Sequence, residues 1–339
     1  MPHQPKISAL MSAFNSGEFI EETIDSILAQ SFEEFELIIV NDGSTDDTED
    51  RILAYNDKRI RYVPLKENVG VGKALSIGLD LVKTPYIAKV DSDDVNHLER
   101  FQKQLNYLYE NPNVALCKAL IEYFPHTSEV AKSERYRYMK ETKEKLLNSV
   151  VSSCDIKKNI ADWLCIPHNS YMAHAAAIKK IGYKDVRMAE DYWLFYKMNE
   201  FGYQFGTVDE VLIKFRVRDT SLTGLGNNTD YYVDTIFEIK STEIDRFIDT
   251  DEPIYIWGVG GLARSVHRAL SKRVKVEGYV NYSVPNPNVL DGIKIFSFPG
   301  ILCKSRKKII LAAQPIREKA VKDMIDAGLA YGKDFFIFA

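Results

Sequence analysis

The chain has 339 residues, a length typical of two domains, and its 45% hydrophobic content is sufficient for buried cores. Its net charge of −4 provides no basic field, so we expect no nucleic-acid partner. The four cysteines lie far apart without a Cys-x-x-Cys pair, which argues against a zinc site or a disulfide framework and favours a reducing compartment. With no signal peptide and no apolar run long enough to span a bilayer, we expect a cytoplasmic protein, with association at the cytoplasmic face of a membrane as the alternative.

The first ninety residues alternate between apolar runs and segments with helical spacing of apolar residues. Thr45 and Asp46 are suited to cap one of these helices. The expected strands are 7–14, 35–40, 60–64 and 86–90, and the expected helices are 18–30, 45–53 and 68–82. This alternation predicts a parallel, doubly wound sheet.

Beyond residue 98 the pattern is less regular. A helix over 98–109 ends at Asn111-Pro112, and the periodicity then weakens over 114–181, where the charged stretch 129–145 indicates a surface helix. The later expected elements are a helix over 188–202, one or two strands over 208–217, a mobile glycine-containing loop over 219–230, a helical connector over 231–248 and a new strand beginning at 254.

The strand predicted at 86–90 leads directly into the acidic sequence Asp91-Ser92-Asp93-Asp94. Open α/β sheets bind ligands at the carboxyl ends of their strands. Adjacent carboxylates repel each other unless a cation neutralises them, and hard divalent ions use one or two carboxylates together with phosphate oxygens. The sequence therefore predicts a site for a metal ion and a diphosphate at this edge.

Two other predicted strands end in polar residues at the same edge, Asn15 and Asp42. Each of the three strand ends has a plainer interpretation: Asn15 as a turn former, Asp42 as a helix cap, and Asp93 as part of a solvated acidic loop. Their convergence on one crevice favours a binding site, because a solvated surface has no reason to gather them.

The order of these motifs resembles the nucleotide-sugar-binding half of family 2 glycosyltransferases. The resemblance continues more loosely through Pro167-His168 and Ala189-Glu190-Asp191 to Arg216 and Ser221. The motifs of the first part are 12–15 (SAFN), 28–32 (LAQSF), 41–46 (NDGSTD), 68–70 (NVG) and 91–94 (DSDD).

The resemblance implies a GT-A fold and inverting transfer from a nucleoside-diphosphate sugar, with UDP as the expected nucleotide. It implies that Asp93 binds Mn²⁺ or Mg²⁺ and that the ion stabilises the leaving diphosphate. Asp42 would accept the imide N–H of uracil. The residues that would contact the donor nucleotide are Ser12, Phe14, Asn15, Asp42, Lys73, Asp91 and Ser92; Lys73 could equally be a solvated helix lysine.

An inverting reaction also needs a base on the opposite face of the donor sugar. By resemblance Asp191 takes this role, with Glu190 beside it; the plainer alternative is a pair of acids that stabilise a helix start. His168 would lie under the acceptor, or serve only as a structural hydrogen-bonding residue. Arg218 stands where relatives often have histidine, and we expect it to contact diphosphate oxygens because arginine does not bind metal.

The C-terminal segment contains a strand followed by Gly258-Val259-Gly260-Gly261, a pattern found in dinucleotide-binding turns. The next predicted strand ends at Asn281, where a ribose-binding acid would be required, so we favour a scaffold for assembly, such as a homo-oligomer, over a cofactor site. The alternatives for the whole chain are a nucleotide-dependent oxidoreductase centred on this turn and an inactive sugar-nucleotide binder with an assembly role.

The expected fold class is α/β, with a GT-A nucleotide-diphospho-sugar transferase domain containing a doubly wound, mixed sheet, and a small Rossmann-like α/β domain. The expected boundaries are 1–228 for the transferase domain, 229–250 for a helical connector and 251–339 for the Rossmann-like domain. The expected partners are a UDP-sugar donor and a glycan, glycoprotein or lipid-linked acceptor, in surface polysaccharide synthesis or protein glycosylation.

Overall fold

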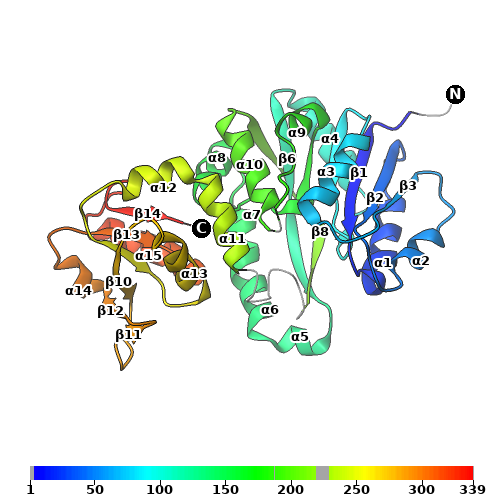
Figure 1. Ribbon diagram of the computed structural model, residues 1–339. Coiled ribbons are helices and arrows are strands. Elements are labelled where there is room, and N and C mark those ends of the chain that lie inside the picture. The colour runs from blue at the N-terminus through cyan, green and yellow to red at the C-terminus, as the bar shows by residue number, and fades with distance from the viewer. Residues whose placement is uncertain (1–3, 187, 219–228, 339) are drawn as a thin grey trace. The chain divides into compact units, whose positions relative to one another are not determined.

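The computed structural model describes residues 4–186, 188–218 and 229–338. The chain divides into two compact units, Met1–Ser221 and Leu222–Ala339, and each is built around one β-sheet (Figure 1). The segment predicted as a mobile loop, 219–230, lies almost entirely outside the described residues.

The described part of the N-terminal unit contains an eight-stranded mixed sheet in the order β3-β2-β1-β4-β7-β6-β8-β5. Strands β3, β2, β1 and β4 are parallel to one another, whereas β7 is antiparallel to both β4 and β6. The strands are β1 (Ile7–Ala13), β2 (Phe35–Asn41), β3 (Ile60–Pro64), β4 (Tyr86–Lys89), β5 (Val95–Asn96), β6 (Val114–Pro125), β7 (Tyr171–His174) and β8 (Gln204–Val217). The parallel half and the mixed character agree with the prediction.

Helices cover both faces of this sheet (Figure 1). Apolar residues of α1, α2 and α4 join one side of β1 and β2 in a single core cluster, whereas Gly78 of α3 packs against Leu10 and Val40 on the other side. The helices are α1 (Gly17–Leu28), α2 (Thr48–Leu53), α3 (Val71–Leu81), α4 (Arg100–Glu110), α5 (Ser128–Lys132), α6 (Glu134–Tyr138), π-helical η1 (Met139–Lys143), α7 (Glu144–Ser149), α8 (Ser153–Asp162), 3-10 helical η2 (His168–Ser170), α9 (Ala175–Ile181) and α10 (Glu190–Glu200).

The structure contains elements that the weak periodicity of 114–181 did not reveal. The long strand β6 is buried through most of its length, so its sequence lacks the alternation that marks a half-exposed strand. Lys118 interrupts its apolar run, and its Nζ donates to the carbonyl of Leu147 at 2.6 Å, which gives the buried side chain a hydrogen-bond acceptor. At α2 the helix begins at Thr48, and the Asp46 carboxylate accepts the Thr48 backbone N–H at 3.1 Å from just outside the helix.

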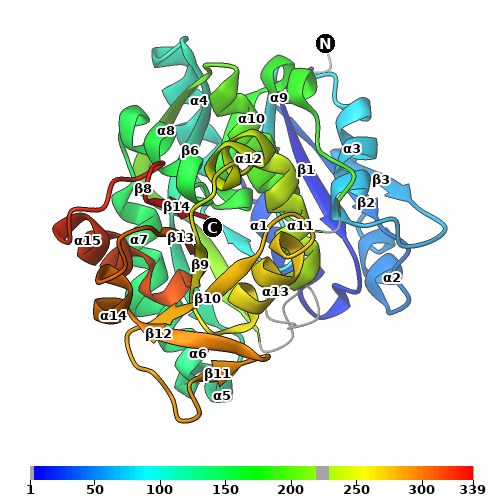
Figure 2. The same ribbon diagram turned by 60° about the vertical axis from the view of Figure 1, so that its left-hand side comes forward.

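The C-terminal unit has a six-stranded sheet, counted over its described residues, in the order β11-β12-β10-β9-β13-β14. Every neighbouring pair is parallel except β11 with β12, and Figure 2 shows β10, β12 and β11 side by side. Its elements are α11 (Thr229–Ile239), α12 (Ser241–Ile248), β9 (Ile254–Trp257), α13 (Gly261–Leu270), β10 (Val276–Asn281), β11 (Val289–Leu290), β12 (Ile293–Ser297), α14 (Phe298–Leu302), β13 (Lys308–Leu311), 3-10 helical η5 (Gln314–Ile316), α15 (Arg317–Asp326) and β14 (Phe335–Ile337).

The strand order of the C-terminal sheet reverses at β9, because later strands are added on the opposite side from β10. This is the additional α/β unit expected from the sequence. The predicted connector corresponds to α11 and α12, which belong to this second unit. Across the described residues, none of the helices combines the length and apolar character needed to cross a membrane.

Candidate active site

The candidate site lies where β1, β2 and β4 end. These strands are adjacent and parallel, with β1 in the centre, so the residues that follow them meet at one edge of the sheet. The Asp42 backbone N–H donates to Ala13 at 2.8 Å, and the hydroxyls of Ser16 and Ser92 are 2.7 Å apart. The first contact joins the ends of β1 and β2, and the second joins the segments that follow β1 and β4.

Asn15 organises the turn after β1. Its φ of 48° is left-handed, a conformation that asparagine adopts more readily than most residues. The side-chain oxygen accepts the backbone N–H of Thr45 at 2.8 Å, and the backbone N–H of Asn15 donates to the hydroxyl of Ser44 at 3.0 Å. The structure thus gives Asn15 a turn-forming role at the site. Phe14 beside it is 42% exposed.

Asp42 is buried behind the loop that precedes α3. Its two carboxylate oxygens accept the backbone N–H groups of Val69 and Gly70, at 2.7 and 3.0 Å. Burial raises the pKa of Asp42, while these two hydrogen bonds oppose the rise. The contacts orient the carboxylate toward one loop, and each oxygen keeps a second acceptor direction for a ligand donor.

Lys73 lies in the first turn of α3 with half of its side chain exposed. Its Nζ is 4.0 Å from a carboxylate oxygen of Asp185, and neither belongs to the acidic group described below. Of the predicted nucleotide contacts, Ser12 lies on β1 next to Val40 of β2, and Phe14, Asn15 and Asp42 follow these strands.

Asp91 is paired with Lys89, a fully buried residue of β4 that the sequence analysis did not single out. The Lys89 ammonium also donates to the carbonyl of Val90 at 2.7 Å. Burial acts to raise the pKa of Asp91, but nearby positive charge, that of Lys89 first, outweighs it, so the pKa is lowered and the carboxylate stays ionised. The signal was present in the sequence: a lysine within an apolar strand needs a buried partner.

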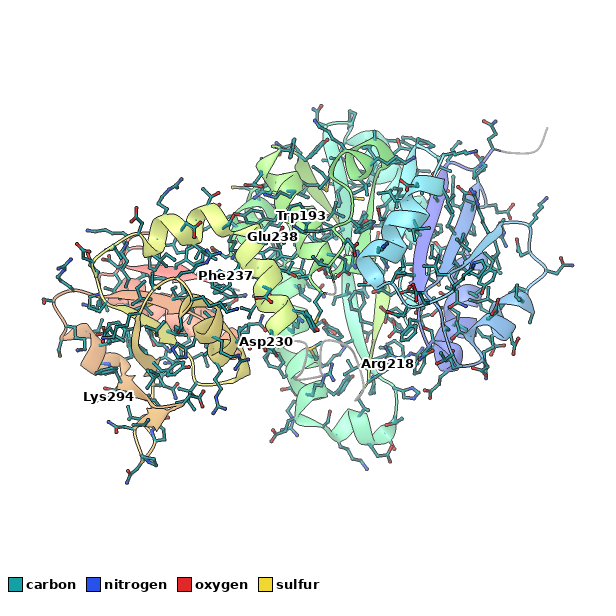
Figure 3. All side chains as sticks on the ribbon, in the orientation of Figure 1. Trp193, Arg218, Asp230, Phe237, Glu238 and Lys294 are labelled. Carbon is teal, nitrogen blue, oxygen red and sulfur yellow. The ribbon has the colours of Figure 1, made fainter. Side chains whose placement is uncertain are left out.

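Asp93 is paired with Arg218. Arg218, labelled in Figure 3, follows β8. The Arg218 Nη2 is 2.7 Å from the Asp93 Oδ2, and about a fifth of the Asp93 side chain remains exposed. Burial raises the pKa of Asp93; the Arg218 charge lowers it, and the nearby Asp91 charge raises it again. The ion pair therefore offsets part of the cost of holding two carboxylates close together.

Asp94 anchors the acidic turn to the protein interior. One carboxylate oxygen accepts the Arg216 backbone N–H at 2.7 Å, the other accepts a hydrogen bond from the Asn169 amide, and the Asp94 carbonyl accepts the Thr23 hydroxyl at 2.9 Å. Burial raises the pKa of Asp94 well above its usual value. Asp94 thus ties β4 to β8 and η2, a structural role that the motif alone did not distinguish from ligand binding.

Glu190 and Asp191 begin α10, after Ala189 turns the chain in a left-handed conformation with φ of 64°. The Asp191 Oδ1 accepts the Tyr192 backbone N–H at 2.7 Å, and the Glu190 Oε1 is 3.5 Å from the Nδ1 of His168. Burial raises the pKa of Asp191 to about 6, and burial followed by the Asp191 charge raises the pKa of Glu190 to about 8. The Asp91 charge contributes to both increases, which places the acids after β4 and at α10 in one electrostatic region.

His168 lies beneath this group and is packed against Tyr171, Tyr183 and Phe195. Burial, and then the Lys89 charge, lower its pKa to about 3, so the imidazole is neutral at physiological pH. Its Nε2 is buried without a hydrogen-bond partner among the described residues.

The oxygen ligands after β4 are chemically suited to Mn²⁺ or Mg²⁺, which take carboxylate, water and phosphate oxygens. Within the described ranges, no group of three or more His, Cys, Asp or Glu side chains is arranged to hold an ion alone. Asp93 with Asp91 therefore fits an ion that also depends on phosphate oxygens. Asp93 would hold such an ion directly.

The Gly-rich turn after β9 has one structural glycine. Gly258 has a φ of +133°, and an added Cβ would lie 2.7 Å from the carbonyl oxygen of Ala312. An added Cβ on Gly260 or Gly261 would meet no atom within 4 Å. At the end of β10, the Asn281 amide donates to the carbonyl of Ser283 at 3.0 Å.

Comparisons with known proteins show the family to which this chain belongs. Residues 8–175 match the model of glycosyl transferase family 2. An uncharacterized glycosyltransferase of Rickettsia typhi is 32% identical over 236 residues, which are 67% of this chain and 68% of that protein. The chain is therefore a member of the family 2 glycosyltransferases, and it is a transferase enzyme. These findings give no support to the oxidoreductase alternative.

Solved structures show the same fold. Residues 1–349 of S. aureus TarS, in complex with UDP-GlcNAc, align with a TM-score of 0.52 at 18% identity, covering 71% of this chain and 67% of that one. The mannosyltransferase PcManGT from Pyrobaculum calidifontis, in complex with GDP-Man and Mn²⁺, aligns with a TM-score of 0.52 at 15% identity, covering 79% and 70%. The fold of the N-terminal unit is GT-A.

Proposed function

We propose that this glycosyltransferase moves a sugar from a UDP-linked donor to a glycan or glycoprotein acceptor, with metal assistance and inversion at the anomeric carbon. The observation that carries the proposal is that the Asp91 charge, after β4, acts on the pKa of Glu190 and Asp191 at α10, and also on that of Asp93 two residues further along. TarS binds UDP-GlcNAc and PcManGT binds GDP-Man with Mn²⁺, which supports a nucleotide-sugar donor and a divalent ion.

The donor side of the site would use the ends of β1, β2 and β4. Asp42 would accept the uracil imide N–H with the acceptor directions left free by Val69 and Gly70. Ser12, Phe14 and Asn15 would border the base and ribose, Asp91 and Ser92 the ribose and diphosphate, and Lys73 the outer side of the nucleotide. A divalent ion at Asp93 would supply Lewis-acid stabilisation of the leaving diphosphate.

Asp191 would act as the base. As the acceptor oxygen forms its bond to the anomeric carbon, the bond from that carbon to the diphosphate oxygen breaks, and the acceptor proton passes to the Asp191 carboxylate. The Tyr192 backbone N–H orients that carboxylate, and Glu190 with His168 forms its surroundings. A base with a pKa of about 6 is ionised near neutral pH and more basic than an ordinary aspartate.

The test is Asp191→Asn, which keeps the shape of the side chain and removes the base. We expect UDP binding with Mn²⁺ to stay within about threefold of wild type by calorimetry, and transfer from a panel of UDP-sugars to fall by about 10²–10⁴-fold, the range for general-base catalysis. Glu200→Gln is the matched control on the same helix, because Glu200 pairs with Lys197 at the surface. Near-normal turnover by Asp191→Asn would overturn the assignment of the base.

A further inference from the structure

Arg218 occupies an unusual position between the metal-binding acid and an aromatic ring. Its Nη2 pairs with Asp93 Oδ2 at 2.7 Å, and its guanidinium carbon lies 4.9 Å from the centre of the Phe19 ring. The Nε–H is buried without a hydrogen-bond partner among the described residues. A buried donor left unpaired lowers the stability of the folded state. Arg218 therefore has one ion pair, to Asp93, and one unpaired donor, its Nε–H, that an oxygen atom of a ligand would satisfy.

Arg216, two residues earlier, provides a comparison, because its guanidinium makes more contacts within the protein. Its Nε donates to the Asp93 carbonyl at 2.9 Å, its Nη2 pairs with Glu22, and its guanidinium lies against Phe19 and Phe124. Only 7% of its side chain is exposed, compared with 24% for Arg218. Arg216 is therefore held in place by the fold, whereas the guanidinium of Arg218 depends on Asp93.

The Asp93 carboxylate needs a cation in either state of the site. Only about a fifth of its side chain is exposed, Asp91 lies two residues away, and Arg218 forms an ion pair with it at 2.7 Å. A divalent ion on the same oxygen would lie within a few ångströms of the guanidinium, and the two cations would repel each other. Metal and arginine therefore compete for Asp93 unless a second anion accepts the arginine.

We propose that Arg218 is an exchangeable counter-ion of Asp93: it neutralises this carboxylate before the donor binds, and it moves to the donor diphosphate when a metal takes its place. The inference deepens the proposed function and rests on it. Because the diphosphate stabilises both the metal and the displaced arginine, nucleotide and metal bind cooperatively, with a reciprocal coupling between their affinities. Arg218 is on this account a binding residue that sets the metal affinity of the empty site.

The experiment measures four affinities: Mn²⁺ alone and with saturating UDP, by electron paramagnetic resonance of free Mn²⁺, and UDP with and without Mn²⁺, by calorimetry. In Arg218→Met we expect Mn²⁺ alone to bind more tightly by about tenfold, because its competitor is gone. UDP in the presence of Mn²⁺ should bind about 10- to 100-fold more weakly, the range for losing one charge-assisted hydrogen bond. The coupling between the two ligands should shrink accordingly.

Two variants control the experiment. Arg218→Lys keeps a positive charge that can pair with Asp93, so its Mn²⁺ affinity should stay near wild type while UDP binding weakens modestly. Arg273→Met removes an arginine that pairs with Asp245 at 2.7 Å in the C-terminal unit, and it should change none of the four affinities. Circular dichroism and the unfolding midpoint report whether each variant is folded.

The outcomes separate the two proposals. Unchanged or weaker binding of Mn²⁺ alone to folded Arg218→Met, or an unchanged coupling with UDP, overturns the exchange at Asp93 while the proposed function stands. A wild-type protein that binds no UDP in the presence of Mn²⁺ overturns the proposed donor site and the exchange with it.

Discussion

At the residue scale, the site depends on carboxylates placed in unequal surroundings. Asp91 has a buried ammonium against it and a lowered pKa, whereas burial raises the pKa of Asp191 even though a backbone N–H donates to its carboxylate. Two aspartates of the same site thus differ in the pH at which they take up a proton. A permanently ionised acid is suited to bind positive charge, and an acid that titrates near neutrality is suited to accept a proton.

The raised pKa of Asp191 predicts the pH dependence of transfer. The base must be ionised, and its pKa in the folded protein is raised to about 6, so activity should be lost as the pH falls through that value. Below it the rate should decrease about tenfold per pH unit, and above it the rate should level off. The measurement is kcat/KM from pH 5 to 8.5 with a nonionising acceptor, over the range where the protein remains folded. A plateau extending down to pH 5 would show that the base is an ordinary aspartate or a different group.

At the scale of elements, the turn between β9 and α13 depends on the backbone conformation of its glycines. The Gly-rich turn between β9 and α13 contains two glycines with different requirements. Gly258 combines a positive φ with a close approach to Ala312, whereas Gly260 has an extended backbone, with φ −86° and ψ −173°, and open space around it. Glycine is therefore required at Gly258, where the end of β9 packs closely against the residue that follows β13.

This contrast predicts unequal effects of alanine. Gly258→Ala should lower the free energy of unfolding by about 2 kcal/mol or more, because the strained φ and the clash with the Ala312 carbonyl add. Gly260→Ala is the matched control and should change it by less than about 0.5 kcal/mol. Urea unfolding of both full-length variants, followed by tryptophan fluorescence from Trp257 in the same unit, measures the difference. Equal effects would contradict the packing role assigned to Gly258.

At the scale of the whole molecule, the chain combines a GT-A unit with a second α/β unit whose parallel sheet has a Gly-rich turn. The two units raise different expectations for nucleotides. The acids of the N-terminal unit favour a nucleoside diphosphate with a metal, whereas the turn of the C-terminal unit was the basis of the alternative with a dinucleotide.

Ligand-linked stability distinguishes them in the intact protein. UDP with Mn²⁺ should raise the unfolding midpoint, since a ligand at 100 times its Kd stabilises the folded state by about 2.7 kcal/mol. NADH and NADPH at the same concentrations should leave the midpoint unchanged. Differential scanning fluorimetry with each nucleotide, with and without Mn²⁺, measures this. A shift with NADH and none with UDP would contradict the proposed donor.

The predicted bounds of helices and strands were most accurate in the first ninety residues, where each strand is followed in sequence by the helix that packs on it. The first four strands and the intervening helices were recognised within a few residues, because apolar runs and turn residues mark them in sequence. The surface helix predicted over 129–145 corresponds to α5, α6, η1 and α7. Strands β6 and β7 and helices α8 and α9 were not recognised, because their burial comes from partners distant in the chain. The predicted division at 228 and 250 and the roles of the site residues stay predictions.

The sequence by itself determined the family, the doubly wound half of the sheet and the acids at its edge, because these follow from local periodicity and an ordered set of motifs. Only the tertiary structure decided which charge each acid meets. Lys89 pairs with Asp91 from within β4, and Arg218 pairs with Asp93 although the two residues lie far apart in the sequence. Protonation and metal affinity depend on such through-space distances and on burial, and neither is encoded in local spacing.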